Sequence, residues 1–125
     1  MNAEPRRCEV ELNWVKCKGD AWCRLDTVNL EHAHFDFMEG VYIIWHGGTD
    51  ARTVYVGQGI IRDRLAEHRL DARIQTFASN ILYVTWAPVD GANCDAVENH
   101  IFDRLKPLVG ERKPVAIPIA VNLPW

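Results

Sequence analysis

Four side chains that can move protons or stabilise negative charge occur between Gly40 and His68. Tyr42 and Tyr55 supply phenols, Arg64 a guanidinium, and His68 an imidazole that titrates near neutral pH. Arg64 and His68 are four residues apart, so in a helix they are neighbours on one face. A set of this kind can bind an anionic oxygen and transfer a proton. The alternative is that the tyrosines are ordinary strand residues and Arg64 is a solvated surface charge.

Glu98 is a further residue whose position suggests chemistry. On a helical wheel it falls within an apolar arc made by Val97, Ile101, Phe102 and Leu105, whereas the other side carries Asn99, His100 and Asp103. A carboxylate on a core-facing arc costs several kcal/mol unless it is paired or bound to a metal. Two interpretations stay open: a buried ion pair, for which Arg64 is the natural partner, or a ligand for a divalent cation at the floor of a cleft.

The segments that hold the tyrosines have the pattern of a β-hairpin. Two runs rich in Val, Ile and Tyr, residues 41–45 and 53–57, flank the turn sequence 46–50. If the valine-rich faces of the two strands coincide, strand alternation places Tyr42 and Tyr55 on the same face of the hairpin, while the valines of the second run face the other way.

The rest of the chain predicts helices around one more strand. The expected elements are an amphipathic helix with Ile61 and Leu65 on its apolar face, a short helix over Leu70–Ala78, a strand over 81–86, a helix from Asn93 to Leu105, and an extended tail from Pro114 to Trp125. This order predicts an α/β (α+β) fold, a small sandwich with a central, mainly antiparallel three-stranded sheet flanked by helices. We expect a single domain at residues 40–125, with residues 1–39 as an N-terminal extension packed on its core.

The N-terminal extension contains a second pair of candidate strands. Residues 9–15 alternate loosely, and residues 22–25 are expected to be their partner across a turn. The chain has no signal-peptide pattern and no apolar run near the ~20 residues that span a membrane, so we expect an intracellular, cytoplasmic protein without membrane contact. In that compartment the four cysteines, Cys8, Cys17, Cys23 and Cys94, are expected to be thiols. Zinc is not favoured, because Cys17 and Cys23 lack zinc-knuckle spacing.

Composition describes a soluble globular chain with little overall attraction to nucleic acid. Its 125 residues are 48% hydrophobic and 25% charged, with a net charge of −3. A protein that grips nucleic acid without sequence preference usually has a basic face. Here Arg62, Arg64, Arg69 and Arg73 cluster in sequence, but Asp63, Glu67 and Asp71 nearly balance them.

Several short motifs, in order along the chain, resemble those of the GIY-YIG nuclease family. They are Gly40-Val41-Tyr42, Tyr55-Val56-Gly57, Arg64-Leu65 with His68, and Glu98 to Phe102 continuing to Pro107. Each motif is weakly specific, but the ordered set is strong, and it covers roughly Gly40 to Pro107.

The resemblance implies a divalent-metal-dependent endonuclease that hydrolyses phosphodiester bonds, with DNA as the expected substrate. It implies Glu98 as the ligand for Mg²⁺ or Mn²⁺, Arg64 as the stabiliser of phosphoryl charge, and Tyr55 as the residue that orients water or phosphate. The general base stays open between Tyr42, with His68 accepting its proton, and His68 itself. Phosphate contacts are expected from Arg62, Arg69 and Arg73, and specificity from a protein partner or a homodimer.

One position departs from the family pattern. An Asn usually follows the proline of the last helix, and Gly110 stands there. We expect Asn122 as the candidate for an equivalent amide. The alternative function is a nuclease-fold module that binds nucleic acid or protein without cutting, which the acidic charge and the missing Asn favour.

Overall fold

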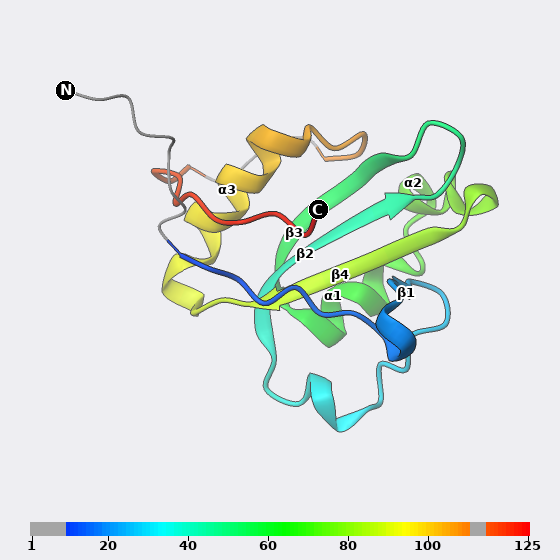
Figure 1. Cartoon of the computed structure of the whole chain (residues 1–125), viewed down its shortest axis with the longest axis horizontal. Helices are drawn as coiled ribbons and strands as arrows, with labels where there is room; N and C mark the ends of the chain where they lie inside the picture. Colours follow the sequence, from blue (N-terminus) through cyan, green and yellow to red (C-terminus); the bar gives the residue numbers. More distant parts are fainter. Residues whose placement is uncertain (1–9, 111–114) are drawn as a thin grey trace.

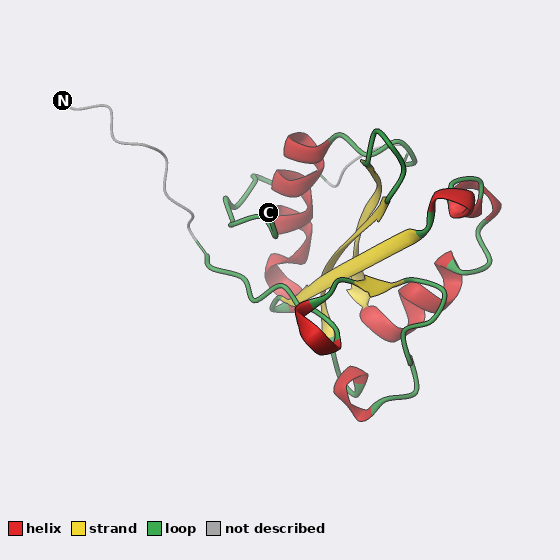
Figure 2. Ribbon diagram, turned by 45° about the vertical axis from the view of Figure 1, so that its right-hand side comes forward, coloured by secondary structure: helices red, strands yellow, loops and turns green. Residues whose placement is uncertain are grey.

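The computed structural model describes residues 10–110 and 115–125, and it shows a four-stranded antiparallel sheet with helices on both faces (Figures 1 and 2). The strand order is β1-β4-β2-β3, so the predicted α+β class is confirmed. Its elements are η1 (Lys18–Asp20), β1 (Cys23–Arg24), η2 (Ala33–Phe35), β2 (Glu39–His46), β3 (Arg52–Ile60), α1 (Ile61–His68), α2 (Ala72–Gln75), η3 (Ala78–Asn80), β4 (Leu82–Pro88), η4 (Gly91–Asn93) and α3 (Cys94–Leu105). In the described part of the chain, no helix is long and apolar enough to cross a membrane.

The β2–β3 hairpin places both tyrosines on the face that packs against α1, as predicted. The register contains a bulge, because Ile44 pairs with Tyr55 whereas the next residue, Trp45, pairs with Thr53. Val54 is therefore the extra residue, and a bulge reverses the alternation on one side of itself. As a result Val54 packs in the same cluster as Tyr42, which corrects the expectation that it faces the other way.

Two apolar layers, one on each face of the sheet, form the core. The layer under α1 includes Tyr42, Ile44, Ile61, Leu65, Val84 and Trp86. The layer under α3 includes Val41, Ile43, Val56, Ala87, Val97 and Ile101. The central strand β4 contributes side chains to both layers, which explains its almost continuous apolar sequence.

The N-terminal extension joins both layers, but not as the predicted hairpin. β1 pairs with β4 instead of with residues 9–15. Val10 forms a parallel bridge with Val121, and the Val15 amide donates to the carbonyl of Trp86 at 2.9 Å. β1 therefore pairs with a strand that is distant in the sequence, and not with the neighbouring segment that the turn sequence suggested.

The helix expected over residues 70–78 is shorter in the structure, where α2 covers only Ala72–Gln75. Leu70 is 87% exposed, so only Ile74 of this segment is buried in the core. A helix with one buried apolar residue gains little from packing and stays short. The tail from 115 to 125 contains no helix, as predicted.

The cysteine prediction was wrong for one pair. Cys17 and Cys23 form a disulfide with Cα atoms 5.1 Å apart, whereas Cys94 is a buried free thiol. Cys8 lies outside the described residues. Disulfides persist in oxidising environments, so this pairing does not support the cytoplasmic location expected from the sequence.

Two arginines fix the segment between β1 and β2 against α1. Arg62 Nε donates to the carbonyl of Leu30 at 2.6 Å, and the same guanidinium contacts the His32 carbonyl and the carboxylate of Asp36. Just past the end of α1, Arg69 donates to the carbonyls of Leu25 and Val28. Charged donors thus satisfy carbonyls of a segment with little regular structure.

Replacing Arg69 with Met should destabilise the protein, because two carbonyls lose their charged donor. The expected loss of free energy of unfolding is about 2–3 kcal/mol, measured by urea denaturation. Arg73→Met is the matched control, since Arg73 is exposed and pairs with Asp71. It should cost less than about 0.5 kcal/mol. Equal losses in the two variants would contradict the role given to Arg69.

Candidate active site

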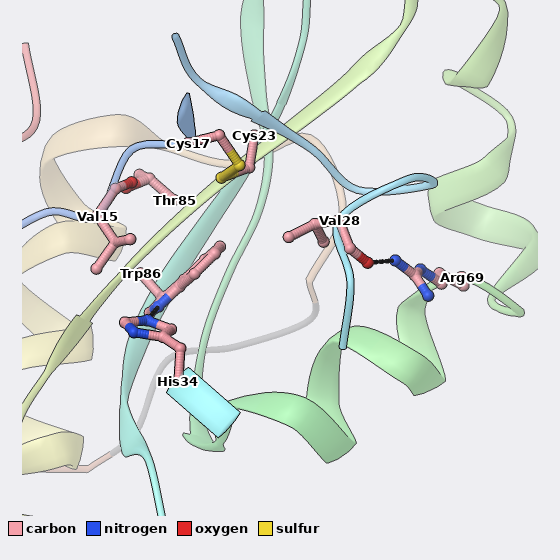
Figure 3. The surroundings of a disulfide bond; sticks show 8 residues. All are labelled: Val15, Cys17, Cys23, Val28, His34, Arg69, Thr85 and Trp86. Carbon is pink, nitrogen blue, oxygen red and sulfur yellow. Dashed lines mark hydrogen bonds between the residues drawn. A yellow bond between two sulfur atoms is a disulfide. The ribbon is translucent and has the colours of Figure 1, made fainter. Parts of the chain in front are cut away.

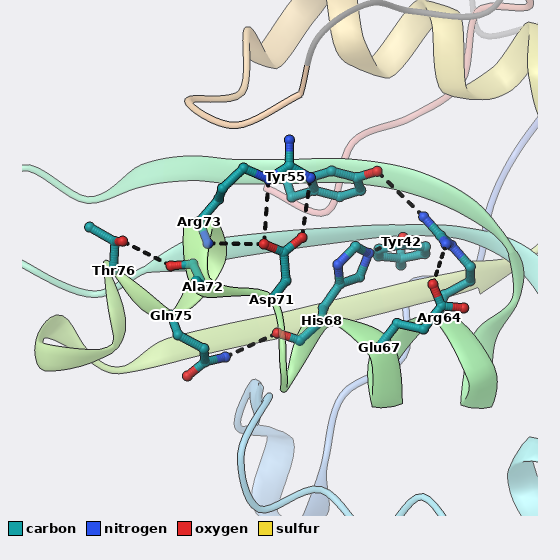
Figure 4. A network of polar contacts seen from close by, with 10 residues as sticks. All are labelled: Tyr42, Tyr55, Arg64, Glu67, His68, Asp71, Ala72, Arg73, Gln75 and Thr76. Atoms are coloured by element: carbon teal, nitrogen blue, oxygen red, sulfur yellow. Dashed lines mark hydrogen bonds and ion pairs between the residues drawn. The ribbon is translucent and has the colours of Figure 1, made fainter.

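A phenol and an imidazole form a buried polar pair between the sheet and α1. Tyr42 projects from β2 and His68 from the last turn of α1, and the Tyr42 hydroxyl oxygen lies 2.5 Å from His68 Nε2 (Figure 4). Tyr42 is 0% exposed and His68 is 4% exposed. The other ring nitrogen, His68 Nδ1, is buried without a hydrogen-bond partner among the described residues. The imidazole therefore makes its one polar contact with Tyr42.

Burial opposes ionisation of both members of this pair. It raises the pKa of Tyr42 well above its ordinary value, although Arg64 acts in the opposite direction. Burial, helped by the positive charge of Arg64, lowers the pKa of His68 to about 4. At neutral pH the pair is therefore a phenol joined to a neutral imidazole, and a neutral imidazole can accept a proton.

Tyr55 and Arg64 form the more accessible side of the same group. The Tyr55 ring stacks on Tyr42, with centroids 6.1 Å apart and planes 16° apart, and its centroid is 4.4 Å from that of His68. Arg64 Nη2 donates to the Tyr55 hydroxyl at 3.4 Å, while Nη1 pairs with Glu67 at 2.8 Å. The structure thus brings together Tyr42, Tyr55, Arg64 and His68, as their spacing suggested.

Glycines on the edge strand β3 make room for this group. A Cβ atom on Gly57 would lie 2.4 Å from the Tyr42 hydroxyl oxygen, so no side chain fits there. Gly59 has a φ of +130°, which only glycine adopts without strain, and a Cβ atom there would lie 3.3 Å from Cγ of Arg64. The backbone glycines are therefore what allows the phenol and the guanidinium to reach the sheet edge.

Glu98 approaches this edge from α3, on the opposite face of the sheet. It is half-buried and makes no hydrogen bond or ion pair with a described residue. The proposed ion pair with Arg64 is not formed, because Arg64 pairs with Glu67. Burial and the neighbouring Asp95 raise the pKa of Glu98 to about 7, while Arg64 lowers it. Glu98 and Arg64 therefore interact electrostatically without contact.

Two residues near Glu98 escaped the sequence prediction. Gln58 of β3 donates to the carboxylate of Asp95 and so ties the edge strand to the first turn of α3. Asn99 was placed on the polar side of the helix, but it is only 4% exposed and donates to the carbonyl of Ala116 at 2.5 Å. The C-terminal segment covers that side of α3. A helical wheel describes only the residues of the helix, so it cannot predict which other segment packs on it.

The residues expected to contact phosphate or replace the family Asn have other partners. Arg62 and Arg69, from which phosphate contacts were expected, donate to backbone carbonyls of the segment before β2. Arg73 is exposed and contacts Asp71. Asn122 bonds through both ends of its amide to the backbone of Leu12, at 2.5 and 2.9 Å. Asn122 thus ties residue 12 to the C-terminal segment, and its place as the substitute amide stays a prediction.

A divalent cation fits this geometry with Glu98 as its single protein ligand. Among the described residues no three His, Cys, Asp or Glu side chains gather into a metal cage. A half-buried carboxylate with a raised pKa and no paired cation is nevertheless a suitable single ligand for Mg²⁺, which keeps most of its waters. Comparisons with models of known protein families, with curated proteins and with solved structures found no match for this chain.

Gly57→Ala should disrupt the group at its centre, because the added methyl would overlap the Tyr42 hydroxyl. We expect a loss of about 1–3 kcal/mol in free energy of unfolding, measured by urea denaturation. Gly48→Ala is the control, since its Cβ would meet only the movable side chain of Asn80, at 2.9 Å. A fully stable Gly57→Ala protein would show that Tyr42 is not confined as described.

Acid should destabilise the protein partly through His68. Its pKa is lowered in the folded state, so between pH of about 6.5 and about 4 only the unfolded chain takes up this proton. Stability is complete above this window and is lost as the pH falls through it, by about 3 kcal/mol. Denaturation of the parent and of His68→Gln at both ends of the window should show a smaller loss in the variant. An identical loss would contradict a buried neutral imidazole.

Proposed function

We propose that this protein is a divalent-metal-dependent endonuclease that hydrolyses phosphodiester bonds in DNA with a site of the GIY-YIG type. The observation that carries the proposal is the buried hydrogen bond between Tyr42 and His68 beside Arg64. A phenol linked to a neutral imidazole is a costly element of a core, and it has an evident use as a proton relay. The ordered motifs of the sequence support the same function.

The geometry favours one of the two candidate bases. His68 Nε2 is occupied by Tyr42, and Nδ1 is buried, so His68 has no direct access to a water molecule. In the reaction we propose, Tyr42 takes a proton from the attacking water and passes its own proton to His68 Nε2. His68 is therefore the final acceptor, and Tyr42, which has no exposed surface, contacts water once Tyr55 or Arg64 moves aside.

The remaining residues would bind and orient the substrate. Arg64 is about one-third exposed and always charged, so it can contact a phosphoryl oxygen and stabilise the developing negative charge. Tyr55 lies beside it and can hydrogen-bond the same group. Glu98 would hold Mg²⁺ or Mn²⁺, which supplies Lewis-acid stabilisation of the phosphoryl oxygens when bound. With Arg62 and Arg69 engaged internally, we expect affinity for DNA to require a partner or a second copy of the chain.

A second function is favoured by the burial of Tyr42. This residue has no exposed surface, so water reaches its hydroxyl only if Tyr55 or Arg64 moves. A module that binds nucleic acid or protein without cutting does not need that movement. The two functions differ in one property, which is metal-dependent cleavage.

Tyr42→Phe should reduce cleavage at least about 100-fold, because it removes the group that accepts the proton from water. Cleavage is measured on duplex, branched and single-stranded DNA and on RNA, with Mg²⁺, with Mn²⁺ and with a chelator. Tyr83→Phe is the matched control, since Tyr83 stacks on Trp45 and has no contact with His68. Cutting that persists in the chelator, or full activity of Tyr42→Phe, would refute the mechanism.

Glu98→Gln tests the carboxylate separately. It should abolish metal-dependent cleavage and leave the protein folded, because no ion pair with a described residue is lost. Thermal denaturation and cleavage are measured on the same preparation. Binding of DNA by the parent protein without cleavage under any condition would instead establish the non-catalytic module.

A further inference from the structure

A cavity of about 490 Å³ lies on the α1 side of the sheet, apart from the residues of the candidate active site. It opens between the segment 15–18 and the segment 28–35, and its inner wall includes Trp86, Phe35 and Cys23. Each of these three side chains is only 2% exposed. Its size is within the range of pockets that bind small organic molecules.

The walls of this cavity are fixed by strong contacts. The Cys17–Cys23 disulfide joins the outer segment to β1 (Figure 3). The Thr85 hydroxyl donates to the Val15 carbonyl at 2.8 Å, which holds the same segment on β4. Across the cavity, Arg69 donates to the carbonyl of Val28. The cavity is therefore preformed, and little of the free energy of binding would be lost in ordering its walls.

The polar side chains that line the cavity offer donors, because their acceptors are already used. Trp86 Nε1 can only donate, and it donates to His34 Nε2 at 3.0 Å, so neutral His34 carries its proton on Nδ1. His32 Nδ1 accepts from the His34 amide at 2.9 Å, which leaves a proton on His32 Nε2. Asn29 Oδ1 accepts from the Glu31 amide at 3.1 Å, and its NH₂ group stays available.

Two lysines add positive charge at the mouth. Lys18 forms no ion pair with a described residue. Lys16 lies over the Trp22 ring and pairs at 3.5 Å with Asp20, whose side chain is 87% exposed. Among the described residues the lining contains no Asp or Glu, although the whole chain has a net charge of −3. The inner wall of the cavity is apolar, and its opening carries hydrogen-bond donors and positive charge. These features together suit an anion that has an apolar body.

We propose that this cavity binds a small aryl carboxylate. The aromatic ring would lie between the half-buried side chains of Val15 and Val28 at the cavity walls, directed toward Trp86 and Phe35 at its base. The carboxylate would lie at the mouth, with Lys18 as its charged partner and imidazole N–H groups as further donors. A single negative charge suits a site in which one lysine is unpaired. This site is independent of the nuclease function.

The test uses 2-naphthoate as the probe, and isothermal titration with the full chain. We expect a dissociation constant below about 1 mM, and at least tenfold weaker binding of the uncharged analogue 2-naphthamide. Lys18→Gln should weaken 2-naphthoate about five- to tenfold. Arg24→Gln removes the same charge from an exposed position outside the lining, and it should leave the affinity unchanged.

Two measurements locate the bound probe. In NMR spectra, 2-naphthoate should shift the indole N–H resonance of Trp86 and leave that of Trp125 in place. Val28→Trp should fill the cavity and abolish binding, with its melting temperature as a check on folding. Equal affinity for 2-naphthamide, an unchanged affinity in Lys18→Gln, or an unshifted Trp86 resonance at saturation would each overturn the proposal, whether or not Val28→Trp folds.

Discussion

The buried hydrogen bond between Tyr42 and His68 is the interaction on which the arrangement of the site depends. A phenol that is completely buried between a sheet and a helix must find a partner, or the fold loses the free energy of its solvation. His68 provides that partner from the last turn of α1, and this fixes how α1 is rotated about its axis. Arg64, one turn earlier, is then directed to the edge of β3, where it meets Tyr55.

The same edge is where the two faces of the sheet come together. α1 covers one face and α3 the other, and β3 is the edge strand over which both pack (Figure 1). Glycines at 57 and 59 keep this edge thin, so a guanidinium on one side and a carboxylate on the other influence each other without contact. Gln58 and Asp95 connect the strand to α3 at this point. The residues of the candidate site lie on both faces of the sheet, and β3 holds the two groups close together.

Two of the arginines in this protein serve the fold. Arg62 and Arg69 donate hydrogen bonds to carbonyls of the segment between β1 and β2. This segment has too little regular structure to pair these carbonyls with its own amides. The disulfide links residue 17 to β1, and the amide of Asn122 holds the C-terminal segment on the backbone of Leu12. Part of what looks like a basic cluster in the sequence is therefore engaged with the backbone in the structure.

The sequence by itself determined the elements whose residues interact locally: the β2–β3 hairpin, α1, β4, α3 and the shared face of Tyr42 and Tyr55. Periodicity and turn chemistry act over a few residues, so they can be read from a linear string. Only the tertiary structure decided the bulge at Val54, the burial of Asn99, the pairing of Arg64 with Glu67, the Cys17–Cys23 disulfide and the roles of Arg62, Arg69 and Asn122. The burial of Asn99 and the roles of Arg62, Arg69 and Asn122 depend on segments distant in the sequence, and the free energy of burial is set by those neighbours rather than by the residue's own type. The Arg64–Glu67 pair and the disulfide join residues close in the sequence, but the fold decides which of several local partners each side chain meets.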